Sequence, residues 1–195
     1  MPLMLFGGLS CQADSATKEL TDDKNPENEL VEGETIKNEV LVERVDTLSL
    51  KILYPHFGKV DFVCGTMPSQ SDTNVLLCTA GSYTGELQET FNHRNIAGDH
   101  VSGGKRYNGY RCERNTGAFV YYNGQWKFLH KNYSAELNVA ASNGGCGFAQ
   151  EMIIHQGEPV TTVRKDSNSN IFRALCQLDG RLCVIESSSA MTFST

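Results

Sequence analysis

Short runs of apolar and polar residues, separated by glycine-containing turns, dominate the chain from Leu48 onward. The runs LSLKILY, KVDFVCG and NVLLCTAGSY are rich in β-branched and aromatic residues, which favour strands. In GAFVYYNGQWKFL, Asn123-Gly124 separates two such arms, as a tight β-hairpin requires. EMIIHQGEPV turns at Gly157 and RALCQLDGRLCVIES turns at Asp179-Gly180 in the same way. The pattern therefore predicts three hairpins, each with a glycine at its bend.

Helical patterns are fewer. YSAELNVAASN predicts a short helix closed by Gly144-Gly145, and SAMTFST predicts the start of a second helix capped at Ser189 or Thr192. We expect an α+β fold, in which antiparallel hairpins form a mixed sheet accompanied by a few helices. The 195 residues suit a single domain, which we place at 46–195. A chain that stops at the start of a helix also suggests that the domain continues beyond Thr195.

Charge separates the first part of the chain from this domain. Asp14 to Asp46 holds 11 acidic and 4 basic residues, whereas the remainder is close to neutral. Residues 12–45 contain too little apolar surface to bury and predict a disordered acidic tether. The chain has no basic stripe, so we expect no nucleic-acid partner.

The apolar run Leu3 to Leu9 is too short to cross a membrane as a helix. Gly8-Leu9-Ser10-Cys11 resembles a lipobox, the processing site of bacterial lipoproteins. This resemblance implies that residues 1–11 are a signal peptide with its lipidated cysteine, that cleavage precedes Cys11, and that the protein is exported to the cell envelope. The membrane is then a partner only through the lipid anchor. The alternative is an ordinary N-terminus with a chance cysteine.

Six further cysteines permit fifteen disulfide pairings in an exported chain. The hairpin predicted for CQLDGRLC places Cys176 opposite Cys183, where Cα atoms about 5.5 Å apart allow a disulfide. Buried thiols are the alternative. Cys146, which lies between glycines in NGGCGFAQ, is a candidate nucleophile if it meets His100 or His155, as in cysteine peptidases.

The stretch HRNIAGDHVSGG concentrates polar chemistry in one loop. Its candidates are His93, Asn95, Asp99 and His100. An acid beside an imidazole suits proton transfer near neutral pH, with Asp99 and His100 in catalytic roles and neighbouring glycines giving a ligand room. A turn stabilised by Asp and Asn is the second interpretation, and a divalent-metal site, which the H-x5-D-H spacing does not specify, is the third. We identify no cofactor and no metal motif.

Three motifs occur in an order that resembles the phosphodiester glycosidase family. These are NTGAFVYYNGQWKFL, FAQEMIIHQGEPV and RALCQLDGRLCVIESSSAMTFST, and the resemblance spans roughly Leu76 to Thr195. Two features depart from the family pattern. The early Asn-Gly-Gly-Phe-Phe type motif is replaced by CTAGSYTGE, and the chain ends before the late Asp-Gly-Gly motif.

The resemblance implies a hydrolase that releases a sugar from a glycosyl-1-phosphodiester in a surface or matrix glycoconjugate. Arg173 is then a clamp for the phosphate, and Asn115, Thr116 and Gln150 are substrate-binding residues together with His93 and Asn95. The structural alternatives are that Arg173 pairs with a carboxylate at a strand edge, that Gln150 orders a loop, and that Asn115 and Thr116 start a strand. The alternative function is a non-catalytic surface module that binds glycans or serves a structural role, which the two departures favour.

Overall fold

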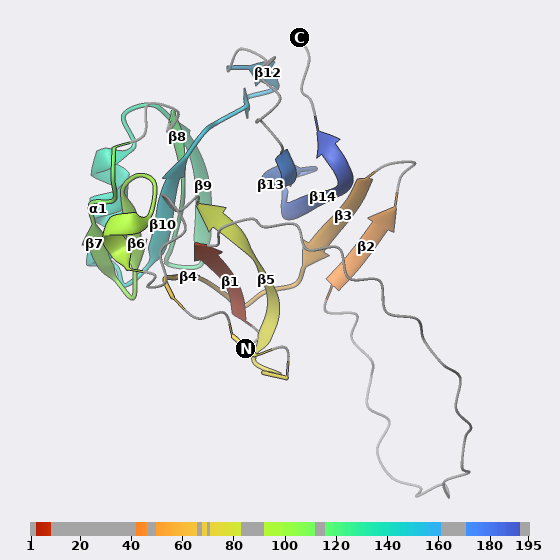
Figure 1. Cartoon of the computed structure of the whole chain (residues 1–195), viewed down its shortest axis with the longest axis horizontal. Helices are drawn as coiled ribbons and strands as arrows, with labels where there is room; N and C mark the ends of the chain where they lie inside the picture. Colours follow the sequence, from red (N-terminus) through yellow and green to blue (C-terminus); the bar gives the residue numbers. More distant parts are fainter. Residues whose placement is uncertain are drawn as a thin grey trace, which may run out of the picture.

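The computed structural model describes residues 3–8, 42–46, 50–65, 68–69, 71–82, 92–111, 116–160 and 171–191. This part of the chain is mostly antiparallel sheet, with one α-helix and one short 3-10 helix. Figure 1 shows α1 and the five-stranded sheet on one side of the molecule, and β2, β3, β13 and β14 on the other.

The five-stranded sheet has the order β7-β6-β10-β8-β9 and is antiparallel throughout. Its strands are β6 (His100–Ser102), β7 (Lys105–Tyr107), β8 (Gly117–Tyr122), β9 (Gln125–His130) and β10 (Cys146–Gln150). Asn123 and Gly124 turn between β8 and β9 with φ of 50° and 75°. Both central residues of a type I′ turn need positive φ, and Asn-Gly meets that need. The predicted hairpin is confirmed.

The helix α1 (Ser134–Ser142) covers one face of this sheet. Its buried Leu137 and Ala140 pack against Val101 of β6 and Val120 of β8. The chain then leaves the helix through Gly144, whose φ of 65° is the left-handed conformation common after a helix end. The helix predicted from YSAELNVAASN is therefore confirmed.

The opposite face of the five-stranded sheet carries the larger core. Phe119 of β8 and Phe148 of β10 pack with Phe62 of β4 (Lys59–Val63) and Val184 of β14 (Arg181–Met191). Because β8 is covered on both faces, its residues from Gly117 to Tyr121 are all buried. A continuous apolar run rather than a strict alternation is the sequence signature of such a strand.

A second sheet is parallel, with the order β4-β1-β5. Its middle strand is β1 (Leu3–Gly8), which pairs with β4 and with β5 (Val75–Ser82). This is the apolar run that resembles the start of a lipoprotein signal. The structure includes residues 3–8 as a strand, whereas Cys11 lies outside the described residues.

The third sheet has the order β13-β14-β3-β2. It contains β2 (Val42–Asp46), β3 (Leu50–Pro55), β13 (Ile171–Leu178) and β14. Two expectations fail here. Residues 42–45, assigned to the disordered tether, form most of β2 because they pair with β3; the rest of the tether lies outside the described residues. The helix expected from Ser189 is also absent, because β14 continues as strand to Met191; Thr192 lies outside the described residues.

The remaining two hairpins are confirmed. β11 (Ile154–His155) and β12 (Glu158–Pro159) turn at Gln156-Gly157, and β13 and β14 turn at Asp179-Gly180, with positive φ at all four turn residues. The single α-helix of the described part is too short to cross a membrane.

Candidate functional site

Several of the predicted site residues converge along β10. His100 lies opposite Phe148, and Gln150 lies opposite Gly117, next to Thr116. The Ala149 amide donates to the carbonyl oxygen of Asp99 at 2.9 Å, which fixes the 99–100 segment against the same strand. The sheet therefore brings together segments that are separated by up to fifty positions in the chain.

The loop before β6 is held rigidly by backbone contacts. Asn92 accepts a hydrogen bond from the Arg94 amide at 2.9 Å and starts a 3-10 helix, η1 (His93–Asn95). The Tyr110 amide donates to the Ile96 carbonyl at 3.0 Å, and Gly98 donates to the Tyr110 carbonyl at 2.9 Å. At Gly109 an added Cβ would lie 2.1 Å from the Ile96 oxygen, so only glycine fits there.

Gly103 and Gly104 have a role different from the one expected. They form the turn between β6 and β7, with φ of 57° and 71°. The hairpin turn requires the positive φ that glycine adopts most easily, so these glycines have a structural reason that needs no ligand.

His93 and His100 form a hydrogen-bonded pair. Nδ1 of His93 lies 2.9 Å from Nε2 of His100, and Nδ1 of His100 lies 3.2 Å from the carbonyl oxygen of Gly98. A carbonyl only accepts, so Nδ1 of His100 carries a proton; in the neutral ring Nε2 is then the acceptor. Nδ1 of His93 must therefore be the donor. This leaves the lone pair of neutral His93 on its Nε2, the nitrogen suited to accept a proton.

Aromatic rings fix the orientation of this pair. The Tyr107 ring stacks on His93 with centroids 3.5 Å apart and an interplanar angle of 6°. Phe62 lies against His100 with centroids 5.4 Å apart. His100 is fully buried, while His93 is partly exposed. His93 can thus meet a ligand, and His100 orients it from behind.

Burial lowers the pKa of both histidines. Desolvation is the main cause at His93, and the positive charge of Lys105 acts in the same direction. At His100, desolvation outweighs the opposing hydrogen bond to Gly98, and His93 adds to the lowering of the pKa. Both rings are therefore neutral near pH 7, as a proton acceptor must be.

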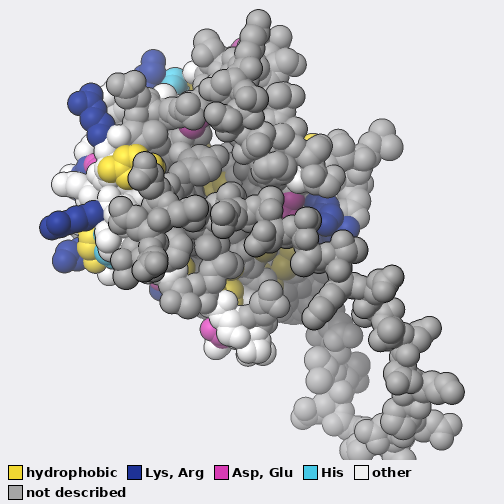
Figure 2. Space-filling view, viewed as in Figure 1, with side chains coloured by type: hydrophobic (Ala, Val, Ile, Leu, Met, Phe, Trp, Pro, Cys, Tyr) yellow, Lys and Arg dark blue, Asp and Glu magenta, His cyan; other side chains and the backbone are white. Residues whose placement is uncertain are grey.

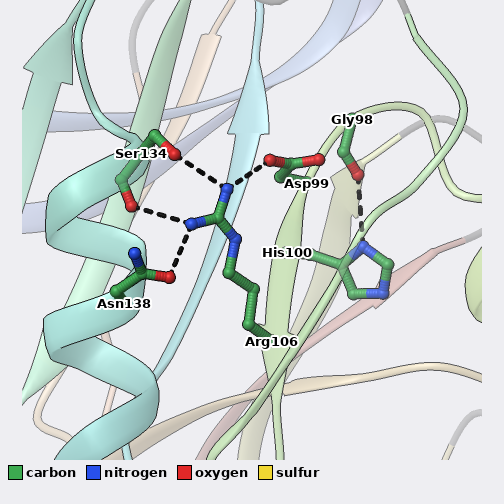
Figure 3. A network of polar contacts seen from close by, with 6 residues as sticks. All are labelled: Gly98, Asp99, His100, Arg106, Ser134 and Asn138. Carbon is green, nitrogen blue, oxygen red and sulfur yellow. Dashed lines mark hydrogen bonds and ion pairs between the residues drawn. The ribbon is translucent and has the colours of Figure 1, made fainter.

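Asp99 turns away from His100 and binds Arg106 of β7 (Figure 3). Nη2 of Arg106 donates to Oδ2 of Asp99 at 2.5 Å and to Oγ of Ser134 at 2.9 Å. Nη1 donates to the Ser134 carbonyl at 3.0 Å and to Oδ1 of Asn138 at 2.6 Å. The two adjacent side chains thus bind different partners, so Asp99 does not orient the His100 ring by a hydrogen bond, although its charge opposes the lowering of the His100 pKa by desolvation; Arg106 ties the loop to α1.

Two basic residues adjoin the partly exposed His93: Arg94 follows it in η1, and the charge of Lys105 acts on its ring. Arg94 and Lys105 are both exposed, and Nζ of Lys105 lies 5.3 Å from the centre of the Tyr107 ring that covers His93. Figure 2 shows Lys and Arg side chains projecting at the edge of the molecule where α1, β6 and β7 lie in Figure 1. The surroundings of His93 therefore favour an anionic ligand.

The other candidates are placed as follows. Asn95 lies in η1, and its backbone N–H donates to the backbone carbonyl oxygen of Asn92 at 3.0 Å. Oγ1 of Thr116 accepts from the Met152 amide at 3.1 Å, and Oε1 of Gln150 accepts from the Glu151 amide at 3.1 Å. Arg173 lies in β13 opposite Glu186, with its side chain outside the described part, and Asn115 is likewise outside it.

Cys146 is not a nucleophile. It is 1% exposed, its thiol donates to the Val60 carbonyl at 3.5 Å, and burial raises its pKa far above the ordinary value. A reactive thiol needs access and a stabilised thiolate, and both are absent. His155 instead lies against His130, with ring centroids 5.4 Å apart.

Sequence reasoning missed three participants: Arg106, Tyr107 and Lys105. The GKRY run that contains them has a turn glycine followed by alternating side chains, which signals a strand but no partner.

No group of three or more metal-binding side chains occurs among the described residues. Comparison of the chain with protein families, with curated proteins and with solved structures finds no match.

Proposed function

We propose that this chain is an α+β exported hydrolase of the phosphodiester glycosidase type, which releases a sugar from a glycosyl-1-phosphodiester. The order of the NTGAF, FAQEMII and RALC motifs supports the family resemblance. The structural observation that supports proton-transfer chemistry is the His93–His100 pair at 2.9 Å, which presents Nε2 of a neutral, partly exposed imidazole.

In the proposed reaction, His93 accepts a proton from water as the water oxygen attacks the anomeric carbon of the sugar. The bond from that carbon to the phosphate oxygen breaks, and a phosphate monoester leaves. The imidazole is already in the required tautomer, because His100 and the Gly98 carbonyl hold the two protons in place. His100 is a positioning residue, since its full burial keeps it from the substrate. Lys105 and Arg94 attract the anionic diester.

Gln150 and Thr116 have side-chain donors that can bind the substrate. The amide nitrogen of Gln150 can donate to a sugar hydroxyl while its Oε1 accepts from the Glu151 amide. The hydroxyl proton of Thr116 can do the same while its oxygen accepts from Met152. We assign the phosphate clamp to Arg173, because a planar guanidinium matches two phosphate oxygens.

The test is release of sugar from methyl diesters of hexose 1-phosphates and N-acetylhexosamine 1-phosphates. Removing a general base costs on the order of 10²–10⁴ in rate, so His93→Gln should lower kcat/KM by that amount. His130→Gln is the matched control, since His130 is also a partly exposed histidine whose ring lies beside a second histidine ring. Equal activity of His93→Gln and the wild type would exclude the proposed base, and full activity of Arg173→Ala would exclude the clamp.

Export with lipidation at Cys11 is part of the proposal and depends on the Gly8–Cys11 match. Metabolic labelling with a fatty acid tests it directly. Label in the wild-type chain and its loss in Cys11→Ser are expected, whereas an unlabelled wild type contradicts the lipid anchor.

A non-catalytic glycan-binding module is the second candidate. The hydrogen bonds of Asp99 to Arg106 and of His100 to His93 and Gly98 favour it, because such contacts also serve to stabilise a loop. Binding on a glycan array, combined with no turnover of any diester, would select this candidate.

A further inference from the structure

Two cysteines face each other across the β13–β14 hairpin. The Asp179-Gly180 turn sets the register in which Cys176 pairs with Cys183. Their sulfur atoms are 3.4 Å apart, and the Cys176 thiol also lies 3.7 Å from the Cys183 carbonyl oxygen. The two side chains therefore share one face of the hairpin and are in contact as thiols.

The two thiols differ in access. Cys183 is fully buried, whereas Cys176 is only partly buried. A disulfide reagent can therefore reach Cys176 first, while Cys183 is already beside it. The hydrogen bond between the thiols raises the pKa of Cys176 and lowers the pKa of Cys183, so access favours one sulfur and thiolate formation favours the other.

The position in the sheet gives the pair a mechanical consequence. β14 is paired with β3 from Val184 to Ser187 on one side and with β13 on the other. In the described part of the sheet, β13 is an edge strand, held only by β14. A bond between Cys176 and Cys183 would fasten that edge to a central strand.

We propose that Cys176 and Cys183 are a reversible dithiol–disulfide couple that staples the edge strand β13 to β14. The oxidant is a low-molecular-weight disulfide. One of the two sulfurs, as a thiolate, attacks it; a mixed disulfide forms, the S–S bond of the oxidant breaks and one thiol leaves. The other sulfur, as a thiolate, then attacks the protein sulfur of the mixed disulfide and releases the second thiol. The protein loses two protons and two electrons, and the oxidant is reduced to two thiols.

The full-length chain, reduced and then incubated with excess oxidised glutathione, tests this. Trypsin cleaves after Arg173 and Arg181, which places Cys176 in peptide 174–181 and Cys183 in peptide 182–195. A non-reducing digest should show these two peptides joined, with a mass two hydrogens below their sum. Cross-linking a short loop should also raise the melting temperature by roughly 5 °C, reversibly on addition of dithiothreitol.

Two variants control the experiment. Cys78→Ser removes a partly buried thiol from β5 and should leave the cross-link and the temperature shift intact. Cys176→Ser should abolish both, with peptide 182–195 recovered as the free thiol. The proposal is overturned if the two peptides remain unlinked in folded oxidised protein, if either cysteine is joined to another one, or if a stable glutathione adduct persists on Cys176.

Discussion

His93 and His100 share one hydrogen bond but have different roles. The Gly98 carbonyl fixes the proton of His100, and that choice fixes the proton of His93. The Tyr107 ring, 3.5 Å from His93, prevents the imidazole from rotating out of line. In the proposed reaction the proton acceptor is therefore Nε2 of His93, and the buried His100 fixes the tautomer of His93 that leaves this nitrogen unprotonated.

The acid limb of the pH–rate profile reports on His93. Because desolvation and Lys105 lower its pKa, kcat/KM should begin to fall only below pH 6.5, the ordinary value for histidine. Lys105→Gln removes a positive charge that opposes protonation and should move the limb to higher pH. Diester hydrolysis measured from about pH 4.5 to pH 8 checks both statements. A limb that does not move in the variant would show that Lys105 does not act on the base.

Stability should also depend on pH through His100. Its folded pKa lies below its unfolded value of 6.5, so the unfolded chain binds more protons as the pH falls below 6.5. The free energy of unfolding is then highest above pH 6.5 and decreases as the pH falls toward the folded pKa. Urea unfolding at pH 7.5 and pH 5.0 should show a smaller difference for His100→Gln than for the wild type. An unchanged difference would mean that other groups carry the effect.

At the scale of single residues, the sequence predicted which side chains lie close together but not which of them pair. His93, Asp99 and His100 are close together in the chain, and they also lie in one site. The partner of Asp99 could not be read from the sequence, because Arg106 is positioned by hydrogen bonds to Ser134 and Asn138 of α1, which are distant in the chain. The choice between neighbouring partners is made by tertiary packing.

Elements were more predictable than their contacts. The three glycine hairpins and α1 follow from local rules, since positive φ and helix closure need particular residues at particular positions. The strand from Ser189 to Met191 was missed because serine-rich ends resemble helix caps in isolation, whereas pairing with β13 extends the strand there.

Arg106 connects β7, α1 and the loop before β6, so its replacement should lower the stability of the fold. Arg106→Lys keeps the charge but loses the planar fork that reaches Asp99, Ser134 and Asn138 together. We expect the free energy of unfolding to fall by about 1–2 kcal/mol, measured by urea unfolding. Lys59→Arg is the comparison, because Lys59 makes an exposed ion pair with Asp61 that a longer cation can keep. Equal stability of Arg106→Lys and the wild type would contradict a role for the fork.

At the scale of the whole molecule, β1 conflicts with the predicted signal cleavage. Removal of the residues before Cys11 would leave β4 and β5 without the strand that pairs with both. The unpaired backbone groups of two strands are costly wherever they are buried. The lipobox resemblance and the strand assignment therefore make opposite predictions about a processed chain.

A chain that begins at Cys11 distinguishes them. If β1 belongs to the folded domain, the melting temperature of this shorter chain should fall by at least about 10 °C relative to the full chain. Differential scanning calorimetry of both proteins, followed by addition of a peptide with residues 1–10, is the measurement. Equal melting temperatures would mean that the domain is complete without β1.

The sequence did not predict the parallel sheet, because register between distant segments leaves no local pattern. Leu3 pairs with Lys59 and with Val75, and the apolar run alone suits a leader or a buried strand equally well. The same holds at the end of the acidic stretch. Val42 to Asp46 forms a strand because it pairs with β3, and no local pattern indicates this pairing.

The place of β1 in the sheet also sets an order of events during synthesis. The ribosome makes residues 3–8 before their partners in β4 and β5, and β5 ends at Ser82. A sheet whose middle strand comes first in the chain closes late, because long-range contacts form only after the intervening chain is available. Until then the apolar residues of β1 lack their partner strands. If the proposed export takes place, the relative rates of targeting and of sheet closure decide the fate of each new chain.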